Sequence, residues 1–372
     1  MAISTSYQDD FFSGKRPWSL IKDDILKNYL PPYLRKVKTL NRGIILIDGF
    51  AGPGKFDDGT VGSPFIICEI AHKYVESNLK IILVNKKKKH HEKLTEVLNE
   101  YLQMGDTYTI HGTAEDLLKQ VKTTLTDETL FVYLDQFGIS GFNFNTLFPY
   151  LTRTKSHSTE FLINICAPVI HRLSTKRTNS PTQKSIYGEK ILTSVFGGDY
   201  WKKSLYDETK TPDEQINNLI IEYCSKLKTY LNYVGFCPVY EKGPGSQLKY
   251  YLIFASRHID AALLLNDIMF KAFWKHIWNC TMKDTLFQEP SYEIVLPCNY
   301  YSDLKNIITA NLKKSNKSRL DLWKCIITEH FMKFHSSDYL KEVKALVDKK
   351  LISFIDVKGT KRLNDEAILN HK

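Results

Sequence analysis

Cysteine is scarce in this chain and widely scattered. The seven cysteines are odd in number, and no two lie within four residues of each other, at positions 68, 166, 224, 237, 280, 298 and 325. Zinc knuckles and iron–sulfur clusters need closely spaced cysteines, and disulfide frameworks use paired ones. The sequence therefore argues against all three classes, and we expect no bound metal.

Long apolar runs are also missing. No segment approaches the roughly 20 consecutive apolar residues that a membrane-spanning helix requires. The N-terminal stretch lacks the charged, apolar and small-residue pattern of a signal peptide. We see no internal repeat and no low-complexity tract. These absences predict a cytoplasmic protein without a membrane partner.

What the chain does contain is enough apolar material for a substantial core. It has 372 residues, of which 43% are hydrophobic, and this length suits one large domain or a domain with a smaller companion. Lysine and arginine number 51 against 41 acidic residues, a net charge of +10. The excess favours a polyanionic partner such as nucleic acid, or reflects a general bias toward lysine.

The most informative stretch is a short apolar run that ends in an acid and a glycine-rich turn. Residues 44–47 are Ile-Ile-Leu-Ile, followed by Asp48, and Gly49, Gly52 and Gly54 come next. Such a run is typical of a strand buried on both faces of a parallel sheet. Glycine lets backbone approach a ligand, so the loop can seat a nucleotide-type ligand or simply make a tight turn. The carboxylate favours a ligand with amino or hydroxyl donors over one with phosphates.

Strands and helices alternate along most of the chain. Strands are predicted at 43–48, 80–85, 108–111, 130–135 and 160–165, and a hairpin at 233–240 and 249–256 around a Gly-Pro-Gly turn. Helices are predicted at 17–38, interrupted by Pro31 and Pro32, and at 64–77, 213–232 and 260–278, with an insertion at about 174–215. The pattern predicts a Rossmann-like α/β fold, a mostly parallel seven-stranded sheet with a terminal antiparallel hairpin.

The C-terminal region has a different rhythm. Helices are predicted at 302–312, 319–334 and 336–349, followed by a small hairpin. This order predicts a winged-helix-like domain at 301–372 after a larger domain at 1–300. Ser337 or Asp338 would cap the last helix, which would be the recognition helix of such a domain and carries Lys341 and Lys344. Winged helices bind nucleic acid or other proteins, and both options stay open.

Several segments together resemble a known family. They are Asp48-Gly49-Phe50-Ala51-Gly52-Pro53-Gly54, Gly62-Ser63-Pro64, the opening helix around Trp18–Lys22, Asp135-Gln136-Phe137-Gly138 and residues 251–274. Within residues 15–275 the chain resembles the three-Cys-motif partner proteins (TcmP), which are similar to class I S-adenosylmethionine-dependent methyltransferases. The resemblance implies a methyltransferase fold, S-adenosylmethionine as cofactor, and a partner that carries a three-cysteine, radical-SAM-like motif.

The resemblance also implies a cofactor site. Its candidate residues are Asp48, Gly49, Phe50, Ala51, Gly52, Pro53, Gly54, Asn85, Lys86, Thr113, Ala114, Glu115 and Asp116. Asn85 stands where these folds usually have an acid for the ribose hydroxyls, so a weaker, uncharged contact is expected. Thr113, Glu115 and Asp116 can hold adenine, or they can cap a helix and pair with its dipole.

Three residues after the fourth strand are the candidate catalytic group. Asp135 would face the methyl donor and bond or deprotonate the acceptor. Gln136 replaces the proline of the family pattern and offers an amide donor and acceptor. Phe137 can stack on a flipped base or pack in the core.

Basic residues outside the pocket are candidates for contact with nucleic acid or the partner. They are Lys87, Lys88, Arg172, Arg177, Lys184, Lys341 and Lys344. Solvated helix ends and an ordinary insertion explain the same residues. The lysine run at 86–89 also fits a ribose 2′-phosphate, but the glycines do not read Gly-x-Gly-x-x-Gly.

Two functions follow as expectations. The first is S-adenosylmethionine-dependent methyl transfer to nucleic acid, together with a three-Cys-motif partner. The second is a non-catalytic, methyltransferase-like subunit that binds nucleic acid or the partner protein.

Overall fold

The computed structural model describes residues 14–136, 138–139, 141–154, 157–174, 183–282, 295–356 and 363–371, without the side chains of residues 184 and 185. The chain divides into two compact units, 1–258 and 259–372. The sequence predicts a boundary near residue 300, and the division by contacts instead assigns helix α12 (Ile259–Thr281) to the second unit.

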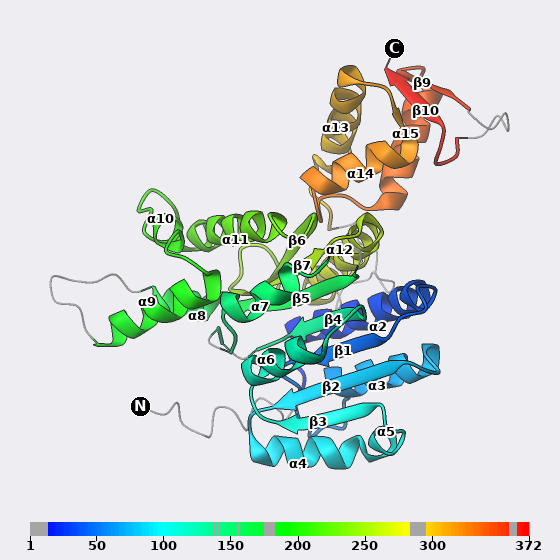
Figure 1. The fold of residues 1–372 in the computed structure, drawn as a ribbon. Coiled ribbons are helices and arrows are strands. Elements are labelled where there is room, and N and C mark those ends of the chain that lie inside the picture. The colour runs from blue at the N-terminus through cyan, green and yellow to red at the C-terminus, as the bar shows by residue number, and fades with distance from the viewer. Residues whose placement is uncertain are drawn as a thin grey trace. The chain divides into compact units, whose positions relative to one another are not determined.

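The first unit is built on a seven-stranded sheet with the order β3-β2-β1-β4-β5-β7-β6 (Figure 1). Its strands are β1 (Ile44–Asp48), β2 (Leu79–Asn85), β3 (Thr107–His111), β4 (Thr129–Leu134), β5 (Thr159–Cys166), β6 (Tyr233–Tyr240) and β7 (Leu248–Ser256). Neighbours among the first five strands pair in parallel, whereas β7 pairs antiparallel with both β5 and β6. The predicted parallel sheet with a terminal antiparallel hairpin is confirmed.

Ten helices of the described part of this unit flank the sheet. They are α2 (Pro17–Lys38), α3 (Ser63–Tyr74), α4 (Lys88–Val97), α5 (Asn99–Gln103), α6 (Ala114–Thr124), α7 (Phe144–Leu151), α8 (Ala167–Leu173), α9 (Gln183–Phe196), α10 (Trp201–Leu205) and α11 (Pro212–Lys228).

The central strand β1 is apolar because both of its faces are covered. Ile45 and Ile47 belong to the large core that α6, α7 and α11 share with the sheet. On the opposite face, Tyr29 and Tyr33 of α2 pack against Phe131 of β4, with ring centroids 6.0 and 5.6 Å apart. All five residues of β1 are buried. A strand buried on both faces reads as a continuous apolar run, as the sequence indicated.

Helix α2 corrects one prediction. Pro31 and Pro32 lie inside a continuous helix and do not interrupt it. Each proline removes a backbone donor, which normally weakens a helix interior. Here Tyr29, Leu30, Tyr33 and other apolar side chains on both sides of the pair are buried. Tertiary packing of this face therefore outweighs the two lost hydrogen bonds.

The described part of the insertion packs onto the first unit. Trp201 is fully buried, and its Nε1 donates to Thr193 Oγ1 at 3.0 Å. The Lys226 ammonium of α11 lies 4.3 Å from the centre of the Phe144 ring and 5.5 Å from that of Tyr200. The large aromatic side chain that stays exposed in this region is Tyr187.

The second unit combines helices with a small sheet. Its elements are α12, α13 (Tyr300–Lys314), β8 (Lys317–Ser318), α14 (Arg319–Glu329), α15 (Ser336–Asp348), β9 (Ile352–Ile355) and β10 (Ile368–His371). β10 pairs antiparallel with both β8 and β9. Three helices and then two strands follow in the expected order, whereas β8 was not predicted and makes the sheet three-stranded. The winged-helix assignment stays a prediction.

Two details of this unit differ from the sequence-based expectation. Helix α14 ends at Glu329 rather than near residue 334. Helix α15 is capped by His335, whose side chain accepts from the backbone N–H of Ser337. Asp338 is instead fully buried and accepts a hydrogen bond from Tyr300 Oη at 3.0 Å.

Among the helices with described residues, none is long and apolar enough to span a bilayer.

Candidate functional site

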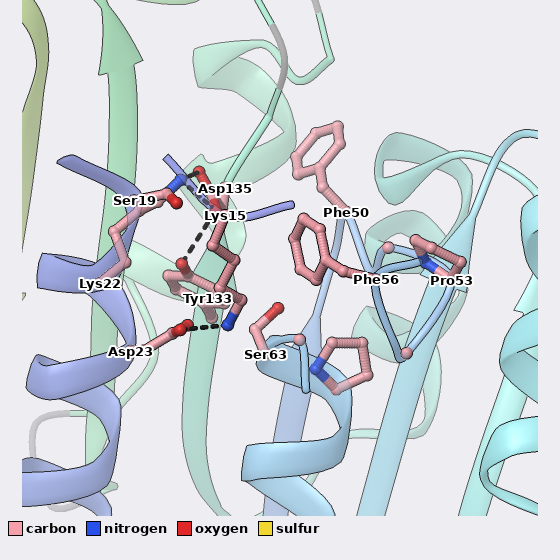
Figure 2. Close-up of a pocket in the computed structure, with 14 residues that line it drawn as sticks. Lys15, Ser19, Lys22, Asp23, Phe50, Pro53, Phe56, Ser63, Tyr133 and Asp135 are labelled. Carbon is pink, nitrogen blue, oxygen red and sulfur yellow. Dashed lines mark hydrogen bonds and ion pairs between the residues drawn. The ribbon is translucent and has the colours of Figure 1, made fainter. Parts of the chain in front are cut away.

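A cavity lies where the chain leaves β1 and β4. Its lining residues come from three segments, the N-terminal helix, the glycine loop and the end of β4 (Figure 2): Lys15, Ser19, Lys22, Asp23, Phe50, Gly52, Pro53, Gly54, Phe56, Gly62, Ser63, Pro64, Tyr133 and Asp135. From β1 the sheet continues toward β2 on one side and toward β4 on the other. This is a topological switch point, where open α/β sheets bind ligands at the carboxyl ends of their strands.

The glycine loop between β1 and α3 is an ordered turn. Lys55 and Val61 form an isolated antiparallel bridge, and Gly62 N donates to Gly54 O at 2.7 Å. Gly54 has φ +84°, and a Cβ there would lie 3.0 Å from Val97 Cγ1. Glycine is therefore required at this position for both backbone conformation and space.

Asp135 is held at the cavity by four hydrogen bonds. Lys22 Nζ donates to its Oδ1 at 2.7 Å and its Oδ2 at 2.6 Å. Tyr133 Oη donates to Oδ2 at 3.0 Å, and Asn164 Nδ2 donates to Oδ1 at 2.6 Å. Because an ionised carboxylate has about four acceptor sites, these donors occupy all of them. The Lys22 ammonium also lies 5.1 Å from the centre of the Tyr250 ring.

Asp48, the other acid at a strand end, is not accessible from the cavity. It is fully buried, and it does not line the cavity. Its Oδ1 accepts from Phe50 N at 3.1 Å and its Oδ2 from Ser63 Oγ at 2.8 Å. Burial raises the pKa of the Asp48 carboxyl to about 7, against the lowering effect of these two hydrogen bonds. Asp48 thus holds Phe50 and Ser63, both of which line the cavity, but does not line it itself.

A second ion pair closes the cavity near the loop. Lys15 Nζ bonds the Asp23 carboxylate and also donates to the carbonyl of Val61. The side chains of Lys15 and Asp23 are 8% and 12% exposed. The ammonium lies 5.2 Å from the centre of the Phe56 ring. Figure 2 shows the two lysines directed to different partners, Lys22 toward Asp135 and Lys15 toward Asp23.

The predicted ribose contact is engaged elsewhere. Asn85 is 7% exposed, its Nδ2 donates to the carbonyl of Ala51, and its Oδ1 accepts from Lys87 N at 2.8 Å. Both polar atoms thus tie the end of β2 to neighbouring backbone. Lys86 is exposed, and its carbonyl lies 3.2 Å from His111 Nε2.

The predicted adenine turn shows the hydrogen bonds of a helix cap. Thr113 Oγ1 accepts from Asp116 N at 3.1 Å and donates to Asp116 Oδ2 at 2.6 Å. Glu115 accepts from Asn143 Nδ2 at 2.8 Å and pairs with Lys119 at 2.9 Å. Ala114 is buried and packs close to Gly49. An adenine contact by these residues stays a prediction.

Of the predicted catalytic group, Asp135 lines the cavity, whereas Gln136 is buried and does not line it. Gln136 is 4% exposed, and its Oε1 accepts from Gly141 N at 2.7 Å. Its buried Nε2 has no hydrogen-bond partner among the described residues. Phe137 lies outside the described residues.

The predicted contact residues are mostly surface side chains. Lys87, Lys88, Arg172, Lys341 and Lys344 are exposed. Lys88 Nζ lies 3.9 Å from Glu92 Oε1, and Lys341 Nζ lies 3.7 Å from Asp338 Oδ1. Arg177 and the side chain of Lys184 lie outside the described part of the chain.

The sequence-based site therefore captured one wall of the cavity. The structure brings Phe50, Gly52, Pro53, Gly54 and Asp135 together there, while Gly49 and Ala51 are buried and do not line the cavity. The wall that was missed consists of Lys15, Ser19, Lys22 and Asp23. Positions 19, 22 and 23 share one face of the predicted helix, and this polar stripe was the available signal, whereas Lys15 precedes the helix.

Two further findings complete the description. Within the described ranges, no group of three or more His, Cys, Asp or Glu side chains is placed to hold a metal ion. The fold and this cavity define an α/β protein with a mostly parallel sheet and a ligand-type pocket at its switch point.

Comparison with known proteins adds the following. No family model matches the chain, and no curated protein matches it. Among solved structures, fibrillarin of Methanococcus jannaschii, a pre-rRNA processing protein, is 12% identical to this chain with a TM-score of 0.30. The match covers 57% of this chain and 66% of the fibrillarin chain, just under two thirds of the fibrillarin length.

Two further solved structures are complexes with a ligand. The O-methyltransferase of Bacillus cereus in complex with SAH is 10% identical with a TM-score of 0.32, over 67% of this chain and 95% of its own. TYW2 of M. jannaschii in complex with AdoMet is 13% identical with a TM-score of 0.27, over 61% and 75%. The strand order, and not these alignments, carries the fold assignment.

Proposed function

We propose that this protein transfers a methyl group from S-adenosylmethionine to a nucleic-acid base, working with a three-Cys-motif partner. The family resemblance over residues 15–275 supports the partner and the cofactor, and the basic net charge supports a polyanionic acceptor. The observation that carries the proposal is the switch-point cavity, in which the glycine loop and Asp135 face each other.

Asp135 would orient the acceptor beside the donor. Hydrogen bonds from Tyr133 and Asn164 orient its carboxylate and occupy two of its acceptor sites. Lys22 occupies the other two, which become available to a ligand only when the Lys22 ammonium moves away. An incoming amino or hydroxyl group would then take the place of the lysine ammonium. Because the sulfonium of the donor is already activated, the protein mainly has to align the acceptor, the methyl carbon and the sulfur.

A second candidate is a methyltransferase-like subunit that binds nucleic acid or the partner without turnover. Two observations favour it. The cavity measures about 60 Å³, room for a few water molecules only. Both polar groups of Asn85 are engaged by backbone and do not await a ribose.

Titration calorimetry on the full chain separates the two candidates. Methyl transfer requires heat on addition of S-adenosylmethionine or S-adenosylhomocysteine, followed by tritium transfer into total RNA or DNA in the presence of the partner. If no heat is detected at ligand concentrations up to about 1 mM, a Kd limit that corresponds to a binding free energy of about −4 kcal/mol, the methyltransferase proposal is ruled out.

A pair of glycine variants tests whether the loop is the donor site. Gly54 and Gly59 both have positive φ, +84° and +81°. Gly54 lines the cavity, and a Cβ there would meet Val97, whereas Gly59 lies outside the lining and a Cβ there meets nothing within 4 Å. Gly54→Ala should weaken binding of S-adenosylhomocysteine at least tenfold, and Gly59→Ala should leave it unchanged. Equal effects would place the donor elsewhere.

A further inference from the structure

The Lys15–Asp23 pair is a built charge site in the cavity wall that the proposed function does not yet use. Its two side chains are almost wholly removed from solvent. It joins the segment before α2, the first turns of α2 and, through the Val61 carbonyl and the Phe56 ring, the glycine loop. Both residues line the cavity itself.

The charges available at this end of the cavity are limited. Asp48 has no exposed surface, and both of its oxygens are bonded inside the protein. Lys22 and Asp135 form the other pair, with both carboxylate oxygens on the ammonium. Of the charged side chains that line the cavity, Lys15 and Asp23 are thus the ones beside the glycine loop.

A buried pair of opposite charges selects the charge pattern of its ligand. A ligand with a single charge would leave one member of the pair, or itself, unbalanced in a poorly solvated space, which is strongly unfavourable. A zwitterion can insert its anion against the ammonium and its cation against the carboxylate. Every charge then keeps an opposite neighbour, and the net charge of the site does not change.

We infer that Lys15 and Asp23 form the subsite for the zwitterionic amino-acid end of the methyl donor. Lys15 pairs with the α-carboxylate of the ligand, and Asp23 pairs with its α-ammonium. This inference rests on the proposed function, and it gives Asp23 the contact with the amino group that the sequence assigned to Asp48.

The test compares two ligands that differ by the amino-acid end. S-adenosylhomocysteine carries the zwitterion, and 5′-methylthioadenosine lacks it. Calorimetry on the full-length wild type should give tighter binding of S-adenosylhomocysteine by roughly 10- to 100-fold, the range expected for charge-assisted hydrogen bonds. Lys15→Met and Asp23→Asn should each reduce this ratio at least tenfold while the affinity for 5′-methylthioadenosine stays unchanged.

Two variants serve as controls. Lys15→Arg keeps the positive charge and should retain most of the ratio. Lys93→Met removes another lysine that pairs with the glycine loop, at 2.9 Å from Asp57, but this pair is exposed and lies outside the cavity lining. It should leave both affinities unchanged.

Each other outcome has a distinct meaning. If the wild type binds neither ligand, the proposed function fails and the subsite fails with it. If S-adenosylhomocysteine binds and the ratio survives in Lys15→Met and Asp23→Asn, only the subsite is wrong. If either variant weakens both ligands equally, the pair is structural, and the inference is overturned.

Discussion

Two acids occupy equivalent places in the sheet, one at the end of β1 and one just after β4, and they have opposite environments. Asp48 is fully buried and bonded to its own loop through Phe50 and Ser63. Asp135 lines the cavity and is bonded by side chains from α2 and β5. Position at a strand end therefore does not decide whether an acid meets a ligand. The side chains that distant elements bring to it decide this.

The largest expected effect comes from the acid that faces the cavity. Asp135→Asn should lower methyl transfer on the order of 10³-fold, because the amide is neutral and cannot accept a proton from the acceptor. Binding of S-adenosylhomocysteine should remain within about threefold of wild type. Tritium transfer and calorimetry measure the two quantities.

Lys22→Met with Asp135→Asn in a double-mutant cycle controls for the buried ammonium that the single change leaves unpaired. A parallel loss of donor binding and transfer in Asp135→Asn would make this acid structural, and the contrast with Asp48 would disappear.

The burial of Asp48 should instead be measurable as a pH dependence of the free energy of unfolding. Its pKa is about 7 in the folded protein and 3.8 in the unfolded chain. Between these values the unfolded chain ionises while the folded protein stays protonated, so the free energy of unfolding falls as pH rises from about 4 to 7. The expected loss is about 3 kcal/mol. Asp48→Asn should remove it in denaturant titrations across this range.

Glu160 provides a matched control for this prediction. It is buried in the same sheet, accepts from Tyr29 and Ser256, and burial raises its pKa to about 7. Glu160→Gln should flatten the profile between about 4.5 and 7 by a similar amount, because its folded pKa is also raised. A profile of Asp48→Asn that runs parallel to wild type would mean that Asp48 is ionised in the folded protein.

A smaller effect is expected at the end of β2, which extends the comparison to a third strand. Asn85→Asp restores the acid that methyltransferase-type folds usually have. A carboxylate cannot donate to the Ala51 carbonyl, which the amide does now. The change should therefore cost about 1–2 kcal/mol of stability, measured by chemical unfolding. A gain in stability or in donor affinity would show that this side chain turns toward the ligand.

The smallest effect is expected for exposed lysines next to that strand. Lys87→Ala and Lys88→Ala should each weaken RNA or DNA binding about two- to fivefold and reduce the slope of log affinity against log salt by about one. Lys80→Ala, an exposed lysine within β2 itself, is the control that should change neither. Unchanged salt slopes in both variants would assign these lysines to the solvated surface.

The sequence predicted the sheet well because each strand has its own local signal. β-Branched and aromatic runs marked five parallel strands within two residues, and the Gly-Pro-Gly turn marked the hairpin. It predicted only the glycine-loop wall of the cavity. The pairing of Lys22 with Asp135 joins residues 113 positions apart, and no local pattern encodes such a contact.

The remaining errors have the same origin. Pro31 and Pro32 were expected to break α2, but helix packing against Phe131 is a tertiary effect that overrides local propensity. The contact of Asp48 with a ligand, expected from its position at a strand end, stays a prediction. In the structure Asp48 is buried and accepts a hydrogen bond from Ser63, the first residue of the following helix, which is again a tertiary contact.

The position of β7 also determines when this sheet can be completed during synthesis. β7 lies between β5 and β6, pairing Glu160–Cys166 with Tyr250–Ser256, so one edge of β5 stays open until about 80 further residues have left the ribosome. An apolar, unpaired strand edge is a template for aggregation. Chains released before residue 248 should therefore be recruited by chaperones or aggregate, and a stop codon in this interval should give an insoluble product.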